Sequence, residues 1–361
     1  MKNERLQLPP VIYAVPGMEM NIYFDNVFLS VNPSNYIFQV TCPIGRNDEK
    51  RWRVIPTEEA AGIHELKLEV SDDTGIIAEA ATRIVIPPAD AGKGRKIRIL
   101  MIGDSLTDHS CYPARLHSLC LDAGIGLDML GTNHPSGFPG ICHEGWGGWT
   151  WNTFLFKDNP TVCSNPQPYH RASEFVVAGN GSFDFAAYLI RHGNGIPPDI
   201  VTIQLGVNDI SGACDENIES TVEKILENSD LMLAGLRLGA PDAVIAIALA
   251  TPGAKSQDAF GANYACGLTR RQYQKNQHYL NRRMIETFSK RESEKLFLIP
   301  SNSNLDCENN FPARPEAVNA DNSSEVLRQS NGLHPAPAGY HQLGDTYFAL
   351  LKALFGWYRI W

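Results

Sequence analysis

The chain has 361 residues, of which 43% are hydrophobic, and its formal net charge at pH 7 is -9. This length accommodates two domains, and the negative charge argues against a surface for nucleic acid or for anionic membranes. No apolar run approaches the roughly 20 residues of a membrane span, so neither a membrane span nor a nucleic-acid partner is expected.

The first ten residues, MKNERLQLPP, have no apolar segment of the kind found in secretion signals. We therefore expect a cytoplasmic protein, or an exported one whose signal is absent from this sequence. The eight cysteines are scattered, and none forms a C-x-x-C pair, so a zinc site on paired cysteines is not expected. Free thiols are favoured over disulfides, although the pattern leaves the disulfide state open.

Residues from about 10 to 88 have the pattern of a small all-β unit. Short alternating or β-branched runs such as YIFQVTC and HELKLEVSD are separated by Asn, Gly, Pro and Asp. The following PPADAGKGRK is typical of a linker. The pattern therefore predicts an N-terminal β-sandwich accessory domain at 1–92 and a second domain at 93–361.

From residue 97 onwards, apolar strand candidates alternate with helical patterns. The predicted strands are 97–103, 127–131, 200–205, 243–249 and 296–299, and the predicted helices are 113–123, 216–238, 270–291 and a last helix with Tyr340 and Leu354 on one face. This alternation predicts an α/β fold with a mostly parallel sheet that is covered on both faces. One long segment, 133–180, is rich in Gly, Pro and aromatic residues and is expected to shape a functional site.

Polar residues follow two of these strands and precede the last helix. Ser105 follows the first strand, Asn208 follows the third, and His334 lies in a proline-containing loop before the final helix. Each also has a plain structural reading as a cap, a turn residue or a loop histidine. Ligands of parallel α/β sheets bind at the carboxyl ends of the strands, so these positions are candidates for a shared site.

Four blocks in this order resemble the SGNH hydrolases, also called the GDSL family. They are GDSL at 103–106, a glycine-rich block at 145–149, GVND at 206–209 and NGLHP at 331–335. The resemblance covers roughly 97–355 and leaves the N-terminal unit unexplained. It implies a flavodoxin-like, three-layer α/β/α domain that hydrolyses esters without a cofactor.

The resemblance also implies roles for single residues. Ser105 is expected to be the nucleophile and His334 its base. The oxyanion is expected to bind the backbone N–H groups of Ser105 and Gly148 and the side chain of Asn208. Gly147 is the second choice for the glycine donor, because GWGGW leaves the register ambiguous.

The family usually carries an aspartate three positions before the histidine, and this chain has Asn331 there. Four hypotheses follow. Asn331 orients His334, a backbone carbonyl does so and leaves a dyad, another carboxylate such as Asp321 or Glu325 folds in, or the enzyme is weak or inactive. A working dyad or an Asn-assisted triad is favoured, since Cys-His-Asn arrangements function in other folds.

The block HEGWGGWT is similar to that of family members that remove acetyl groups from carbohydrates, which predicts an esterase for short acyl groups on a glycan or small molecule. Trp146, with Trp149 and Trp151 nearby, is expected to offer a flat stacking surface, although Trp149 is expected in the core. Trp146, Gly147 and Asp104 are assigned to substrate binding, and Asp104 is expected mainly to cap or form the turn.

Three other functions remain open at this stage. One is a lipid-type or thioester hydrolase, and another is a carbohydrate-binding protein with a relic active site. The third is a metal-dependent hydrolase using His134, His143 and His170, which lack the spacing of a known metal motif, so no metal is expected. The role of the N-terminal unit and homo-oligomerisation are also left open.

Overall fold

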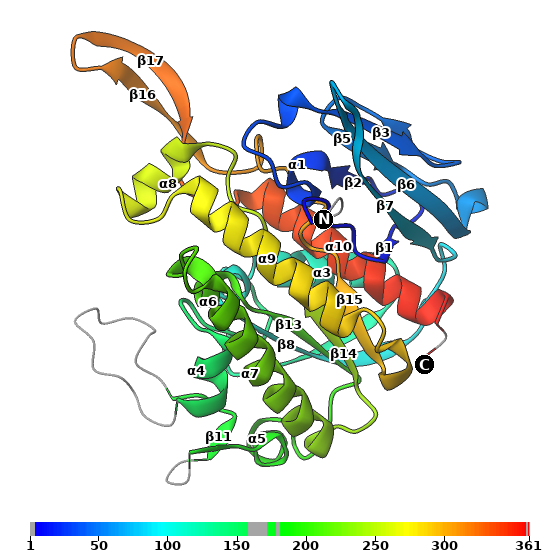
Figure 1. Ribbon diagram of the computed structural model, residues 1–361. Helices are drawn as coiled ribbons and strands as arrows, with labels where there is room; N and C mark the ends of the chain where they lie inside the picture. Colours follow the sequence, from blue (N-terminus) through cyan, green and yellow to red (C-terminus); the bar gives the residue numbers. More distant parts are fainter. Residues whose placement is uncertain (1–3, 158–171, 178–180, 359, 361) are drawn as a thin grey trace.

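The computed structural model describes residues 4–157, 172–177, 181–358 and 360 (Figure 1). Its centre is a parallel sheet in the order β9-β8-β13-β14-β15, with β10 continuing the edge beside the end of β8. The strand bounds are β8 Lys96–Gly103, β9 Gly126–Leu130, β10 Glu144–Gly145, β13 Ile200–Gln204, β14 Val244–Ala248 and β15 Leu296–Ile299. The predicted flavodoxin-like α/β/α fold is confirmed, and all five predicted strands are present.

Helices cover both faces of this sheet (Figure 1). Helices α3 (Cys111–Asp122) and α10 (Pro337–Gly356) pack together on one face, whereas α5 (Phe185–His192), α7 (Ile218–Gly239) and α9 (Arg270–Phe288) lie on the other. Strand β8 lies between β9 and β13, so the chain first adds β9 on one side of β8 and later adds β13 on the other side. This is the switch point at which α/β sheets bind ligands.

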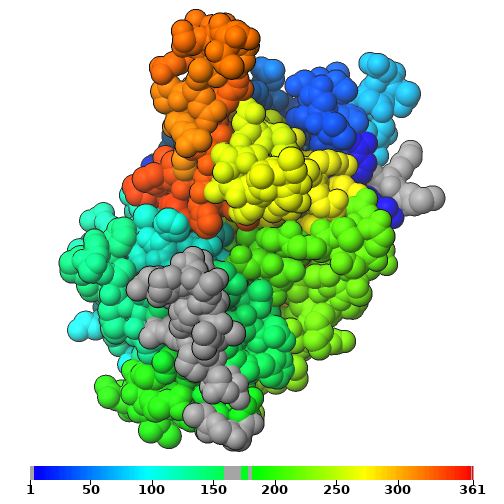
Figure 2. All heavy atoms as spheres, turned by 90° about the vertical axis from the view of Figure 1, so that its left-hand side faces the viewer, coloured from blue at the N-terminus to red at the C-terminus, as the bar shows by residue number. Residues whose placement is uncertain are grey.

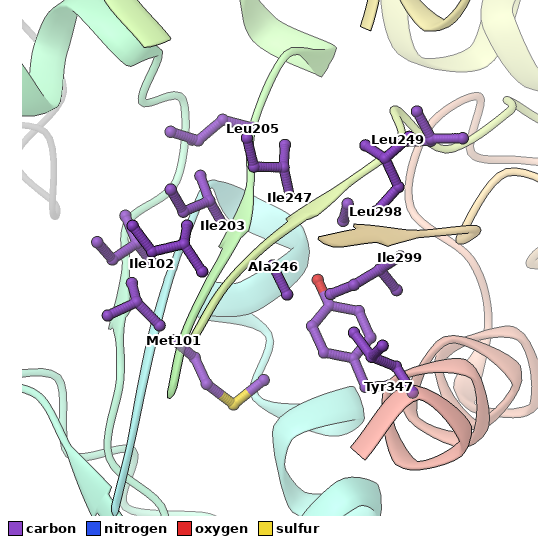
Figure 3. Packing of buried hydrophobic residues seen from close by; sticks show 14 of the residues in the cluster. Met101, Ile102, Ile203, Leu205, Ala246, Ile247, Leu249, Leu298, Ile299 and Tyr347 are labelled. Carbon is purple, nitrogen blue, oxygen red and sulfur yellow. The ribbon is translucent and has the colours of Figure 1, made fainter. Parts of the chain in front are cut away.

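The core forms between the sheet and these helices. Successive residues of β8, β13, β14 and β15 are buried because helices cover both faces, which explains their continuous apolar runs. Figure 3 shows Ile102, Ile203 and Ile247 from neighbouring strands together on one side of the sheet, with Met101, Ala246 and Tyr347 of α10 on the other side. This rigid sheet holds the strand ends at fixed spacings.

The N-terminal region is a β-sandwich with its own core. One sheet has the order β1-β7-β6-β3 and the other β2-β5-β4, and residues such as Ile22, Trp52 and Leu68 are buried between them. The bounds are β1 Val11–Tyr13, β2 Met20–Tyr23, β3 Ile37–Thr41, β4 Arg46–Asn47, β5 Arg51–Val54, β6 Gly62–Asp72 and β7 Gly75–Ile86, with α1 at Phe24–Val27. The boundary at residue 92 stays a prediction.

The sandwich contacts the loop that follows β15. Asn304 Oδ1 accepts the backbone N–H of Asn21 (2.9 Å), and Asn26 Nδ2 donates to the carbonyl of Leu305 (2.8 Å). Both asparagines of the sandwich are buried, so these bonds are shielded from water and anchor the loop firmly. The N-terminal unit therefore braces a loop of the α/β domain.

Several elements were not predicted. The hairpin of β16 (Ala313–Asn319) and β17 (Asn322–Gln329) projects from the body, and both strands are mostly exposed (Figures 1 and 2). The shorter elements are α2 Ser105–Asp108, α4 Trp151–Phe156, α6 Val207–Ser211, α8 Gln257–Tyr264, β11 Val176–Val177 and β12 Ser182–Phe183. The hairpin has polar residues on both faces, so it lacks the alternation that marks a half-buried strand.

Within the described ranges, no helix is long and apolar enough to cross a membrane. The seven described cysteines are free thiols: Cys42, Cys111, Cys120, Cys142, Cys214, Cys266 and Cys307. The eighth, Cys163, lies outside the described residues, as does most of the middle of the 133–180 segment.

Candidate active site

Ser105 is the first residue of α2, immediately after the turn that ends β8. Asp104 caps this helix, because its Oδ1 accepts the backbone N–H of Leu106 (2.9 Å). Asp104 has 0% exposure, so its assignment to substrate binding is wrong, whereas its expected role as a cap is confirmed. The turn leaves Ser105 partly exposed at the carboxyl end of the sheet.

His334 reaches Ser105 from the loop between β17 and α10. The Nε2 atom of His334 lies 2.8 Å from Ser105 Oγ. Two hydrogen bonds hold this loop in place. Gly332 N–H donates to Asn263 Oδ1 (2.9 Å), and Ala254 N–H donates to the carbonyl of Gly332 (2.9 Å). Two residues that are 229 positions apart in the chain are thus brought into hydrogen-bonding contact.

The molecule contains a second serine–histidine contact, and its hydrogen bonds are those of a structural pair. Ser110 Oγ lies 2.8 Å from His143 Nε2, and both residues are fully buried. The backbone N–H of Gly145 donates to His143 Nδ1 (3.0 Å), so the proton of the neutral ring must be on Nε2. His143 therefore donates to Ser110 and cannot take its proton.

Asn331 holds the backbone of the histidine loop. Its Oδ1 accepts the N–H groups of Leu333 (3.1 Å) and His334 (2.9 Å). Among the described residues, no hydrogen bond joins Asn331 to the imidazole. The hypothesis that Asn331 orients the His334 ring directly is therefore not supported, and the residue instead fixes the loop from which the ring extends.

The two alternative carboxylates lie on the projecting hairpin. Asp321 is in its turn and Glu325 is on β17, both are exposed, and neither has a contact with His334 within the described part of the chain. The aromatic neighbour of His334 is His109, whose ring centroid is 5.3 Å away. The described contacts of the His334 ring are therefore with the Ser105 hydroxyl and the His109 ring.

We expect Asn331→Asp to leave kcat close to the wild-type value. An aspartate keeps an acceptor for both backbone N–H groups, so the loop is preserved. Asn331→Ala removes the acceptor and is expected to cost about 1–3 kcal/mol of stability. Thermal unfolding and ester hydrolysis of both variants check this. A rise of kcat by about tenfold or more in Asn331→Asp would show that a missing charge limits the reaction.

Burial, with a smaller effect of the charge of His109, lowers the pKa of His334 to about 4. The ring accepts a proton only when it is neutral, so activity is lost as the pH falls through this value. We expect the acidic limb of kcat/KM near pH 4, well below the usual value of about 6.5 for histidine. A pH profile of ester hydrolysis measures this, and a limb near 6.5 would contradict a buried base.

The glycine-rich block begins beside the end of β8, where Gly145 pairs with Gly103. Gly147 N–H donates to Asp108 Oδ2 (3.2 Å), whereas Gly148 N–H has no acceptor among the described residues. Gly148 is exposed and has φ +76°, a conformation that favours glycine. Of the two glycines, Gly148 is therefore the one with a free donor.

Asn208 lies at the end of β13 in the short helix α6. One hydrogen of its Nδ2 is donated to the carbonyl of Trp149 (3.0 Å), which leaves the second hydrogen available. The neighbouring Asp209 Oδ1 accepts the backbone N–H of Trp151 (3.2 Å). The two residues of α6 therefore also hold the glycine-rich block.

The expected aromatic stacking surface is absent from the described structure. Trp146, Trp149 and Trp151 are only 6%, 2% and 1% exposed. Trp146 Nε1 donates to Glu144 Oε2 (3.0 Å), a buried carboxylate that also accepts from Tyr188. The prediction of a stacking surface is wrong for Trp146, whereas the expectation that Trp149 packs in the core is confirmed.

Two enclosed carboxyl groups, Asp104 and Asp209, flank the site. Burial raises the pKa of each to about 7, although a backbone N–H bonded to each opposes the shift. No role is predicted from the sequence for Asp209, nor for Asp108 and Asn133, which contact the glycine-rich block. The available signal for Asp108 was its place three residues after Ser105, which puts the two on neighbouring positions of a helix.

The histidines considered as metal ligands are dispersed. His134 Nδ1 contacts Cys142 Sγ (3.0 Å), His143 contacts Ser110, and His170 lies outside the described residues. No group of three or more candidate ligands occurs in the part of the chain that the structure describes.

A serine in contact with a histidine at the switch point of a parallel sheet is the arrangement of a serine hydrolase. The family model of GDSL-like lipases and acylhydrolases matches residues 99–346. The chain belongs to this family, and it is an esterase of the SGNH type. A search of curated proteins found no match.

Solved structures of similar fold include a family 3 carbohydrate esterase from Clostridium thermocellum, with 19% identity, a TM-score of 0.38, and coverage of 72% of this chain and 100% of that one. A family 3 carbohydrate esterase from Talaromyces cellulolyticus has 17% identity, a TM-score of 0.42, and coverage of 72% and 98%. A carbohydrate acetylesterase family member from Sinorhizobium meliloti has 14% identity, a TM-score of 0.39, and coverage of 72% and 99%.

Proposed function

We propose that the protein is a serine esterase that removes short acyl groups, acetyl above all, from a carbohydrate. The observation that carries this proposal is the 2.8 Å contact between Ser105 Oγ and His334 Nε2. The resemblance of HEGWGGWT to acetyl-removing family members supports the acyl group. No cofactor is needed for this chemistry.

In the first half of the reaction, Ser105 Oγ attacks the ester carbonyl while His334 Nε2 takes the hydroxyl proton. The negative charge that develops on the carbonyl oxygen is stabilised by the N–H groups of Ser105 and Gly148 and by Asn208 Nδ2. His334 then gives its proton to the alcohol oxygen as the ester bond breaks. The alcohol leaves, and the acyl group remains on Ser105.

In the second half, water replaces the alcohol. His334 takes a proton from the water as its oxygen attacks the acyl carbon, and the same donors stabilise the second oxyanion. The bond from Ser105 Oγ to the acyl carbon breaks, and His334 returns the proton to Ser105. Because the buried ring has its pKa near 4, it starts each half-reaction neutral at ordinary pH.

The surroundings of the donors favour a hydroxylated alcohol over a lipid. An open hollow of about 410 Å³ adjoins Asn208, and eight of its nine lining residues are polar, with Ile225 as the exception. These polar side chains offer hydrogen-bond partners to the hydroxyl groups of an alcohol, whereas an alkyl chain would cover them without hydrogen bonds.

The experiment is hydrolysis of p-nitrophenyl acetate, p-nitrophenyl octanoate and glucose pentaacetate, with Ser105→Ala as the background. We expect turnover of both acetates and a much lower kcat/KM for the octanoate. Preference for the octanoate would show a lipid-type hydrolase. A folded wild type with no activity above the Ser105→Ala background would show a binding protein with a relic active site.

A further inference from the structure

The helix that begins with the nucleophile also carries a carboxylate that contacts the glycine-rich block. Asp108 is the last residue of α2, three positions after Ser105. Its Oδ2 accepts the N–H of Gly147 (3.2 Å), and its Oδ1 accepts Asn133 Nδ2 (2.8 Å). Both carboxylate oxygens of Asp108 therefore accept hydrogen bonds from other residues.

Asn133 completes the connection from the other side. Besides Asp108, its Nδ2 donates to the carbonyl of Gly145 (2.8 Å), and its backbone forms an antiparallel bridge with His143 through two hydrogen bonds of 3.0 and 3.2 Å. Asn133 thus holds the start of the block, whereas Asp108 holds its middle. Both contacts lie just before the residue with the free donor.

Close packing sets the approach of α2 to this block. A Cβ on Gly145 would lie 2.7 Å from the backbone nitrogen of Asp108 and 2.7 Å from Thr107 Cβ, so the two backbones touch directly. Packing against a glycine fixes the separation of the two segments, and Trp146 N–H, which donates to the carbonyl of Gly103 (3.0 Å), holds the next peptide group. The Asp108 contact holds the N–H of Gly147, one residue before Gly148.

We propose that Asp108, held by Asn133, is a positioning residue that sets the Gly148 N–H at its working distance from Ser105. The inference rests on the proposed function, because it assigns Gly148 to the oxyanion. The carboxylate suits this task since both of its oxygens accept, and it receives N–H groups from two directions. An amide at position 108 would turn a donor toward one of these partners.

Small displacements of an oxyanion donor have large effects on rate, since a misplacement of about 1 Å costs up to 10²-fold. We expect Asp108→Ala to lower kcat on p-nitrophenyl acetate by about 10- to 10²-fold with little change in KM. Asn133→Ala keeps the Asp108–Gly147 bond, and Asp108→Asn keeps one acceptor, so both are expected to lose less. Asp122→Ala, at the exposed end of α3, is the matched control and is expected to behave as the wild type.

A comparison with the thionoester of the same acid separates positioning from general damage. N–H donors stabilise a developing charge on oxygen better than one on sulfur, so a displaced donor slows the oxygen ester more than the thionoester. We expect the ratio of kcat/KM for the oxygen ester to kcat/KM for the thionoester to fall in Asp108→Ala. In Asp108→Asn, this ratio is expected to be partly restored. A merely unfolded fraction lowers both rates equally, so an unchanged ratio in Asp108→Ala and Asn133→Ala would overturn the proposal.

Hydrogen exchange tests the same contacts without any activity. We expect the peptide covering 145–151 to exchange faster in Asp108→Ala and in Asn133→Ala than in the wild type or in Asp122→Ala. If the wild type does not cleave esters but this difference is found, the contacts hold the block and the proposed function has failed. Equal exchange in all four proteins would overturn the positioning role.

Discussion

Ser105→Ala is expected to lower kcat/KM on p-nitrophenyl acetate by about 10⁴- to 10⁶-fold, because no covalent intermediate forms without the hydroxyl. The fold should survive, since the caps of α2 and the packing of β8 do not use the Ser105 side chain. Initial rates over a wide range of enzyme concentrations measure the loss, and circular dichroism verifies that the variant is folded.

Ser110→Ala is the matched control for this loss. Ser110 has the same 2.8 Å contact with a histidine. Because Gly145 N–H donates to His143 Nδ1, the proton of His143 is on Nε2, and this nitrogen cannot accept the Ser110 proton. We expect Ser110→Ala to lose stability and to keep most of its kcat below its melting temperature. A loss equal to that of Ser105→Ala would contradict the assignment of the nucleophile.

His334→Ala is the second change with a very large expected effect, about 10⁴-fold or more in kcat. Without the ring, the Ser105 hydroxyl keeps its proton and is a weak nucleophile. The substitution also leaves a space of the size of an imidazole beside Ser105. Added imidazole is therefore expected to restore part of the activity, in proportion to its neutral fraction.

Rescue distinguishes a lost base from a distorted site. His143→Ala removes a buried ring of the same size next to the glycine-rich block, and we expect imidazole to restore none of whatever activity this variant loses. If imidazole fails to rescue His334→Ala while the variant is folded, or if His334→Ala retains most of its kcat, the role of His334 as the base is refuted.

The sequence predicted the α/β domain well because its strands are buried on both faces. Runs such as RILMI and IVTIQL are continuous and apolar, and the observed β8 and β13 match the predicted ranges within a residue. The same predicted strand ranges also indicated which polar residues stand at the strand ends. Ser105 and Asn208 therefore lie where the parallel sheet brings the strand ends together.

The side-chain environments could not be predicted, because they depend on contacts between distant segments. Trp146 lies in the glycine-rich block, where a stacking surface was expected, yet Glu144 and Tyr188 form a buried polar network around its indole N–H. The role of Asn331 was open for the same reason: its oxygen binds the two nearest backbone N–H groups rather than the ring. Asp108 was missed because its partners, Gly147 and Asn133, lie 39 and 25 residues away.

The central claim is that Ser105 is a nucleophile activated by His334, and covalent trapping tests it most directly. The protein is incubated with a p-nitrophenyl alkylphosphonate, and the labelled peptide is identified by mass spectrometry. We expect one phosphonyl group per chain, on the peptide that contains Ser105, and a much slower reaction in His334→Ala. An adduct on another residue, or no adduct on folded wild-type protein, would contradict the claim.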